Sequence, residues 1–168
     1  YWNPAKYPFC IGRAGVAVNY TPWLRQLVND INLAYVSGFY RLGDYQALSA
    51  SLRYFSLGEV STSSDMSSSD NMTISPYEMS VDVAYSRMLS ETFSAAVALR
   101  FIYSDITYDY SDETSPGKAF AADIALYWNR YFTGRTREWN MGIGLNISNI
   151  GSKISYGGDD NSEFIPTN

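Results

Sequence analysis

The segment Phe93–Tyr103 reads FSAAVALRFIY, and an apolar residue occupies every odd-numbered position in it. The even-numbered positions as far as Arg100 carry small or polar side chains instead. Successive side chains of a β-strand point to opposite faces of the sheet, so a period of two indicates a strand with one apolar and one polar face. The segment therefore predicts a strand whose two faces meet different surroundings.

The same alternation recurs in six other segments, with some irregularity in the first three: Arg13–Tyr20, Asp30–Arg41, Tyr45–Leu57, Glu78–Met88, Phe120–Trp128 and Trp139–Ile147. The predicted strands are about 9 to 13 residues long, and a tilted strand that crosses a membrane needs about 9 to 11. A soluble β-sandwich alternates as well, but its strands average about 5 to 6 residues. The lengths favour an all-β, transmembrane antiparallel β-barrel over a sandwich.

The residues on each predicted face support the same choice. The polar face combines small residues with isolated charges: Ser49, Ser51, Ser80, Ser86, Gly142, Gly144, Arg53, Asp82, Arg100 and Asp123. Aromatic residues gather near the predicted strand ends: Tyr20, Trp23, Tyr40, Tyr54, Tyr103, Trp128, Tyr131 and Trp139. Small polar residues suit a barrel lumen, and lipid headgroups select an aromatic girdle at the two interfaces.

The connections between the predicted strands alternate in length. Short ones (42–44, 89–92, 132–137) alternate with longer ones (21–29, 58–77, 104–118), as the tight turns and long external loops of outer-membrane barrels do. The start of the first long connection, Thr21–Leu27, breaks the strand period and suggests a helical turn. The tail Ser152–Asn168 is expected to be a loop that leads into another strand. Bacterial barrels normally have an even number of strands, at least eight, so seven predict a domain, 1–168, that is incomplete at both ends.

Composition excludes several classes of function. The chain has 168 residues, of which 16% are aromatic and 17% charged, against about 25% charged in a typical soluble domain. The net charge of -5 argues against nucleic acid as a partner, since phosphate binding needs a basic surface. There is no histidine, which removes Ser–His pairs and histidine metal sites. We therefore expect no enzyme activity, no catalytic or metal-binding residues and no cofactor.

Charged residues on the predicted lumen face still have to be explained. Asp82 and Asp123 could form a catalytic carboxylate pair, but we favour ion pairs with lumen cations such as Arg53 or Arg100, because charges at membrane depth need partners or water. Acidic residues in two loops could hold a calcium ion, but they lack EF-hand spacing and solvated loops are preferred: Asp109, Asp112, Glu113, Asp159, Asp160 and Glu163. Glycines on the lumen face of the last predicted strand are expected to leave room for a bulky neighbour.

Several separated strings in this order carry a resemblance to a known family. YWNPA at Tyr1–Ala5 resembles the Asn-Pro-Ala signature of FadL-type outer-membrane transporters. The strings 21–30 (TPWLRQLVND), 51–59 (SLRYFSLGE), 84–90 (AYSRMLS) and 146–156 (NISNIGSKISY) are similar to the PorV (LptO) family of the type IX secretion system in Bacteroidota. The resemblance covers nearly the whole chain.

This resemblance implies a 14-stranded FadL-like barrel in the cell outer membrane, of which the chain supplies about seven to eight strands. It also implies a non-enzymatic secretion component that works with proteins, in contact with outer-membrane lipid. The implied partners are a Sov/SprA-type translocon barrel, the C-terminal domains of secreted cargo and a PorU-type sortase complex that attaches cargo to the cell surface. The alternative function is a FadL-like transporter of hydrophobic small molecules.

The residues that contact these partners cannot be assigned by a motif, so we predict them from position. The long connections face the outside in an outer-membrane barrel and are the segments a secretion partner can reach. We therefore predict partner contacts at Trp23, Leu24, Arg25, Leu27, Asp65, Asp70, Tyr108 and Tyr110.

Overall fold

The computed structural model describes residues 2–22, 31–58, 60–62, 72–105, 115–133 and 138–157. Its elements are η1 (Pro4–Phe9, a 3-10 helix), β1 (Ala14–Pro22), β2 (Ile31–Arg41), β3 (Gln46–Leu57), β4 (Val60–Thr62), β5 (Met72–Ile74), β6 (Tyr77–Ser90), β7 (Phe93–Asp105), β8 (Ser115–Thr133), β9 (Glu138–Gly151) and β10 (Ser155–Gly157). Among the described residues, no helix is both long enough and apolar enough to cross a membrane.

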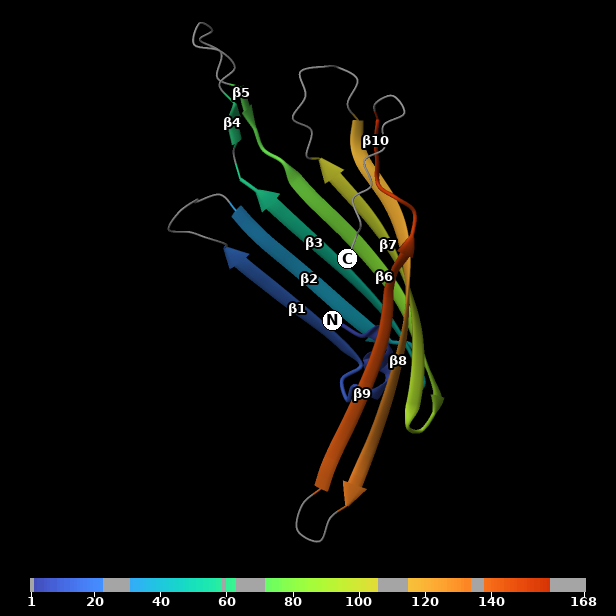
Figure 1. Cartoon of the computed structure of the whole chain (residues 1–168). Helices are drawn as coiled ribbons and strands as arrows, with labels where there is room; N and C mark the ends of the chain where they lie inside the picture. The colour runs from blue at the N-terminus through green and yellow to red at the C-terminus, as the bar shows by residue number, and fades with distance from the viewer. Residues whose placement is uncertain are drawn as a thin grey trace, which may run out of the picture.

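The long strands form one antiparallel sheet in which nearly every strand pairs with its neighbour in sequence. The order is β1-β2-β3-β6-β7-β8, and both β9 and β10 pair with β8. The sheet curves into a half-barrel, with a concave face that η1 lies against and a convex face on the outside (Figure 1). All seven strands predicted from the alternation are present, so the predicted fold class is confirmed.

Burial in this sheet is the reverse of burial in a soluble protein. On β6, Val81, Val83 and Tyr85 are 36%, 53% and 41% exposed on the convex face. Their neighbours Asp82 and Ser86 are buried on the concave face, 8% and 1% exposed. Apart from Pro8 and Pro76, the buried apolar side chains of the described chain are all alanines (Ala5, Ala47, Ala84, Ala96, Ala98, Ala119 and Ala125). A sandwich would bury its large apolar side chains between two sheets, so the barrel interpretation holds.

The two ends of the sheet differ, as expected. We call the end with the β2–β3, β6–β7 and β8–β9 connections the turn end, and the opposite one the loop end (Figure 1). At the loop end, an aromatic ladder crosses β3, β6 and β7: the rings of Tyr54 and Tyr77 lie 5.8 Å apart, and those of Tyr77 and Tyr103 lie 5.9 Å apart. Aromatic pairs across strands stabilise a sheet and suit a headgroup interface.

Several predicted connections are shorter than expected, because the strands continue past their alternating part. Thr21 and Pro22 end β1 and are not helical, while the rest of that predicted turn lies outside the described residues. The segment 58–77 contains the β4–β5 hairpin. The tail is not only a loop either: β10 returns to pair with β8, with Ser155 opposite Lys118. Backbone groups at a strand end keep pairing even where the side chains no longer alternate.

Candidate functional site on the concave face

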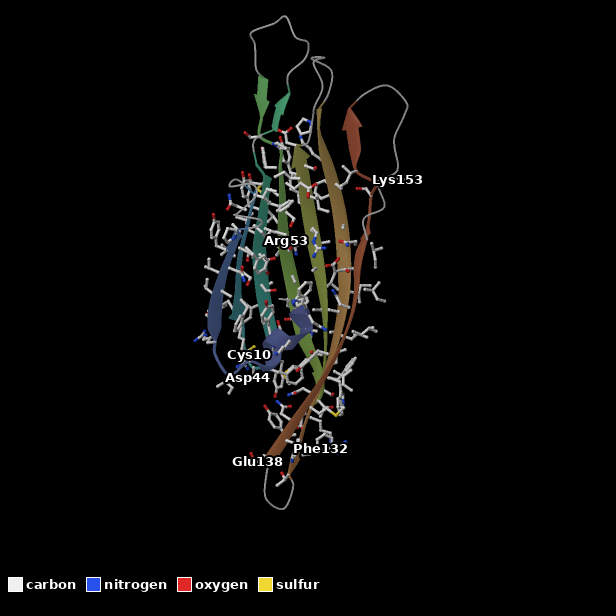
Figure 2. All side chains as sticks on the ribbon, turned by 60° about the vertical axis from the view of Figure 1, so that its left-hand side comes forward. Cys10, Asp44, Arg53, Phe132, Glu138 and Lys153 are labelled. Carbon is white, nitrogen blue, oxygen red and sulfur yellow. The ribbon has the colours of Figure 1, made fainter. Side chains whose placement is uncertain are left out.

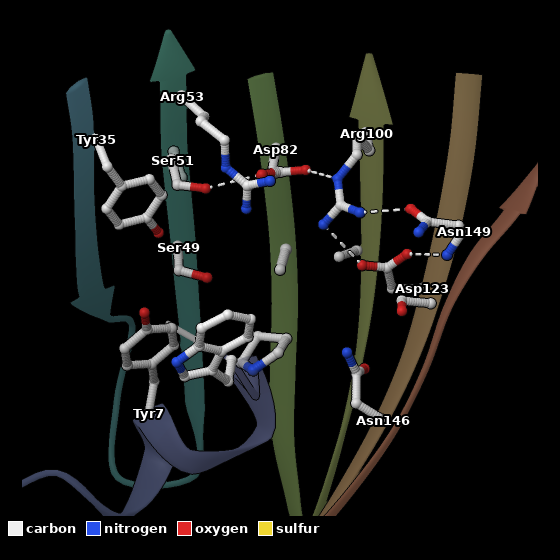
Figure 3. Close-up of a pocket in the computed structure, with 16 residues that line it drawn as sticks. Tyr7, Tyr35, Ser49, Ser51, Arg53, Asp82, Arg100, Asp123, Asn146 and Asn149 are labelled. Carbon is white, nitrogen blue, oxygen red and sulfur yellow. Dashed lines mark hydrogen bonds and ion pairs between the residues drawn. The ribbon is translucent and has the colours of Figure 1, made fainter. Parts of the chain in front are cut away.

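Arg100 joins three strands at the centre of the concave face. It lies on β7, directly across from Asp82 on β6, and its Nε forms an ion pair with the Asp82 carboxylate. Its Nη2 pairs with Oδ2 of Asp123 on β8 at 3.0 Å (Figure 3). Both carboxylates are buried, at 8% and 5% exposed. The prediction that lumen carboxylates pair with a lumen cation is therefore correct, and one arginine serves both.

A β-bulge on β9 completes this cluster. The pairing of β8 with β9 shifts between Ala122 and Ile124, and Asn149 adopts the left-handed backbone conformation, with a φ of 62°. Asn tolerates this conformation better than most residues. The bulge directs the Asn149 side chain to Arg100, whose Nη1 donates to its Oδ1 at 2.6 Å. The Asn149 backbone N–H donates to Oδ1 of Asp123 at 2.8 Å.

Hydrogen bonds hold both carboxylates of this cluster in place. The remaining oxygen of Asp82, Oδ2, accepts from the Ser51 hydroxyl at 2.9 Å, so both oxygens of each carboxylate have a partner. Among the described residues no group of His, Cys, Asp and Glu could hold a metal ion. The arrangement suits a structural network that fixes the lumen wall.

A polar pocket of about 290 Å³ lies between this cluster and η1 (Figure 3). Trp2, Pro4 and Tyr7 line it from the N-terminal side, and Tyr35 lines it from β2. The remaining lining is mostly small or polar: Ser49, Ala50, Ser51, Arg53, Asp82, Ala84, Ala98, Arg100, Asp123, Asn146, Ser148 and Asn149. An apolar ligand would have to desolvate these polar groups, which makes this part of the concave face a poor route for a fatty acid.

The N-terminal segment is held against the concave face by Asn3. Its Oδ1 accepts from the Ala5 backbone N–H at 2.9 Å and caps η1. Its Nδ2 donates to the backbone carbonyls of Leu126 on β8 (2.8 Å) and Leu145 on β9 (3.3 Å). The Asn-Pro pair is an N-cap followed by a proline in the first turn, which is a strong local signal for a helix start. The motif that carried the family resemblance thus ties η1 to two strands.

Further contacts from β2, β7 and β8 hold η1 in place. The Ser94 hydroxyl on β7 donates to the Ala5 carbonyl. The Tyr7 ring stacks on Phe39 of β2 with centroids 4.8 Å apart, and the Phe9 ring lies 5.6 Å from Tyr127 of β8. Burial, and then Tyr35 and Cys10, raise the pKa of Tyr7 above its ordinary 10.0, so this phenol stays protonated near neutral pH.

Glycines on the concave side of β9 leave room for bulky neighbours, as the sequence predicted. A Cβ on Gly142 would lie 2.2 Å from the Tyr127 hydroxyl oxygen, and one on Gly144 would lie 2.7 Å from Asn3 Nδ2. Both glycines face the concave side of β9 and admit bulky neighbours there. Ala47, Ala96 and Ala125 are buried on the same side, where larger residues would occupy the volume of η1.

The residues predicted to contact partners all lie outside the described residues, in 23–30, 63–71 and 106–114. Trp23, Leu24, Arg25, Leu27, Asp65, Asp70, Tyr108 and Tyr110 therefore remain predictions. Sequence reasoning missed the docking of η1 and the role of Asn149. The pair Asn3-Pro4 could have predicted the start of η1. The bulge at Asn149 leaves no mark in the alternation of apolar and polar residues.

A comparison with protein-family models agrees with the resemblance seen in the sequence. The model described as type IX secretion system protein PorV matches residues 1–168, the whole chain. No curated protein sequence matches the chain. With an all-β half-barrel whose apolar side chains face outward, and a family match from end to end, the chain belongs to the PorV family of type IX secretion system proteins.

Proposed function

We propose that this protein is a non-enzymatic component of the type IX secretion system in the outer membrane. In this proposal it binds the C-terminal domains of secreted cargo at a Sov/SprA-type translocon barrel and passes the cargo to a PorU-type sortase complex at the cell surface. Residues 1–168 then form part of a single 14-stranded FadL-like barrel domain. The observation that carries the proposal is the PorV family match over the whole chain.

The concave face supports a protein-handling role over a lumenal transport role. η1 and Asn3 occupy the concave side near the turn end, and the pocket beside them is lined by charged and hydroxylated residues. A binding site for a hydrophobic small molecule needs a mostly apolar pocket. In this proposal cargo meets the protein on its outside, and we keep segments 23–27, 65–70 and 108–110 as the predicted contacts.

One feature favours the alternative, a FadL-like transporter of hydrophobic small molecules. A second hollow of about 420 Å³ at β1 and β2 is lined by Gly15, Val16, Ala17, Val18, Asn19, Tyr35, Ser37, Gly38, Phe39 and Tyr7. Its lining is more apolar than that of the first pocket. An acyl chain bound in this hollow of the full-length protein would favour the transporter function over the secretion function.

A pull-down tests the two functions against each other. The full-length tagged protein is purified from native outer membranes, and the proteins and lipids that accompany it are identified by mass spectrometry. Recovery of a very large barrel protein together with secreted proteins that share a C-terminal domain supports the secretion role. Recovery of the barrel alone with bound fatty acid or other hydrophobic small molecules supports the transporter.

Loop variants then test the predicted contacts. Trp23→Ala, Leu27→Ala and Tyr108→Ala are introduced singly and together, and Tyr131→Ala at the turn end serves as the matched aromatic control because it is 67% exposed. The loop variants should lose cargo from the pull-down and secretion from the cell, while the control keeps both. Unchanged cargo recovery in the combined variant would exclude these segments as the contact surface.

A further inference from the structure

Charged side chains on the convex face are distributed unequally between its two ends. The alternation of the strands places Arg87 on this face toward the turn end of β6 and Arg130 toward the turn end of β8. Arg13 precedes β1 at the same end, and its guanidinium lies over the ring of Tyr40 on the convex face. Toward the loop end, the convex face carries Asp105 and Lys118, whose opposite charges cancel. Arginines on the convex face of the described strands therefore gather at the turn end, whose connections and strand ends also carry the acidic residues Asp44, Glu91 and Glu138.

Two of these arginines are held in place by aromatic rings. The Cζ atom of Arg13 lies 5.5 Å from the centre of the Tyr40 ring, and that of Arg130 lies 5.4 Å from the Phe132 ring. Stacking of this kind orients a guanidinium and leaves its N–H donors free to bind an anion. Arg13, Arg87 and Arg130 are all exposed, and within the part of the chain that the structure describes none of them forms an ion pair.

We propose that Arg13, Arg87 and Arg130 form a binding rim for the phosphate groups of anionic phospholipids in the leaflet that meets the turn end. The inference rests on the outer-membrane location that belongs to the proposed function. The planar guanidinium matches phosphate through paired N–H donors, and its aliphatic stem lies along the apolar strand surface. Arginines near a membrane surface add to the attraction of anionic lipid.

The surface beside the rim identifies the anion as a lipid. On β6, the residues next to Arg87 on the convex face are Tyr85, Val83 and Val81, which are 41%, 53% and 36% exposed. In the outer membrane, acyl chains cover this apolar row, so the phosphates within reach of Arg87 are those of phospholipid headgroups. One phospholipid places its phosphate on the guanidinium while its acyl chains lie against the valines. The rim therefore binds a phospholipid and not a soluble anion.

Lipid binding to purified protein tests the rim. The full-length protein is delipidated in an uncharged detergent and titrated with phosphatidylglycerol or phosphatidylcholine, and the bound lipids are counted by native mass spectrometry. Each of Arg13→Gln, Arg87→Gln and Arg130→Gln should weaken phosphatidylglycerol binding about fivefold. The triple variant should bind the two lipids alike. Lys118→Gln, which removes a cation from the loop end of the same face, should keep the preference.

The controls separate the rim from misfolding and from the proposed function. A heat-dependent shift in gel mobility verifies that each variant is a folded barrel before titration. A folded triple variant that still prefers phosphatidylglycerol would overturn the rim, as would a loss of preference in Lys118→Gln as large as in the triple variant. Cargo recovery in the pull-down is a separate readout: its failure refutes the secretion role, whereas the lipid preference reports only on the rim.

Discussion

Replacing Arg100 with methionine should destabilise the barrel strongly, because it leaves two buried carboxylates without their cation. Asp82 and Asp123 are 8% and 5% exposed, and Arg100 contacts both. Removing one partner of a buried ion pair typically costs about 3–5 kcal/mol. The polar pocket beside the cluster can supply some water to the carboxylates, so we expect a loss near the lower limit, about 3 kcal/mol in the free energy of unfolding.

A urea titration of the full-length protein folded into lipid vesicles, followed by tryptophan fluorescence, measures this loss. Arg100→Lys keeps the charge but lacks the planar guanidinium that reaches both carboxylates. Its free energy of unfolding should therefore lie between that of Arg100→Met and that of the wild type. A triple variant that combines Arg100→Met with Asp82→Asn and Asp123→Asn removes the charges together. It should recover most of the loss, because neutral replacement of a buried ionic cluster is often close to neutral in stability.

Two outcomes would refute this reasoning. If Arg100→Met unfolds within about 0.5 kcal/mol of the wild type, the carboxylates are hydrated in the folded barrel and the cluster does not stabilise it. If the triple variant is as unstable as Arg100→Met alone, the loss comes from missing packing and hydrogen bonds around Arg100, and not from unpaired charge.

Three further changes test how η1 docks on the concave face. Gly142→Ala places a methyl group against the Tyr127 hydroxyl and should cost about 1–3 kcal/mol in the same titration, and adding Tyr127→Phe should relieve part of that cost. Asn3→Ala removes the cap of η1 and its bonds to β8 and β9. The backbone amides of residues 5–10, other than Pro8, should then exchange faster in hydrogen-exchange mass spectrometry, and unchanged exchange would contradict this anchor. Ser94→Ala leaves the Ala5 carbonyl without its donor and should cost about 1–2 kcal/mol of unfolding free energy, and a loss under about 0.3 kcal/mol would count against the contact.

The strands could be predicted from the sequence because each meets two different environments. β7 was predicted as Phe93–Tyr103 and extends to Asp105, since its alternation continues over almost its whole length. β8 was predicted as Phe120–Trp128 but extends from Ser115 to Thr133. Its ends, Ser115-Pro116-Gly117 and Tyr131-Phe132, do not alternate. Backbone pairing alone extends the strand there, and no side-chain pattern reports it.

The concave site could be predicted only in outline. The sequence indicates that Asp82, Asp123 and Arg100 share the lumen face and need partners. Which of them meet depends on strand register, and the sharing of Arg100 between β6 and β8 follows from the β6–β7 and β7–β8 pairings. Asn149 enters the cluster only through a one-residue bulge with positive φ. Such a bulge depends on tertiary contacts that local alternation does not encode.

The network on the concave face also explains what specifies the register of this sheet. In a soluble protein a slip by one residue is prevented because it would expose the apolar face to water. Here the apolar face already points outward, so a slip would instead move Asp82, Arg100 and Asp123 to the convex face. In a barrel those charges would then meet hydrocarbon without partners, at a cost of several kcal/mol for each charge. The described sheet has no hydrophobic core of large side chains, so the ion pairs select one register instead. The N-terminal segment reinforces that register, because Asn3 donates to backbone carbonyls of both β8 and β9.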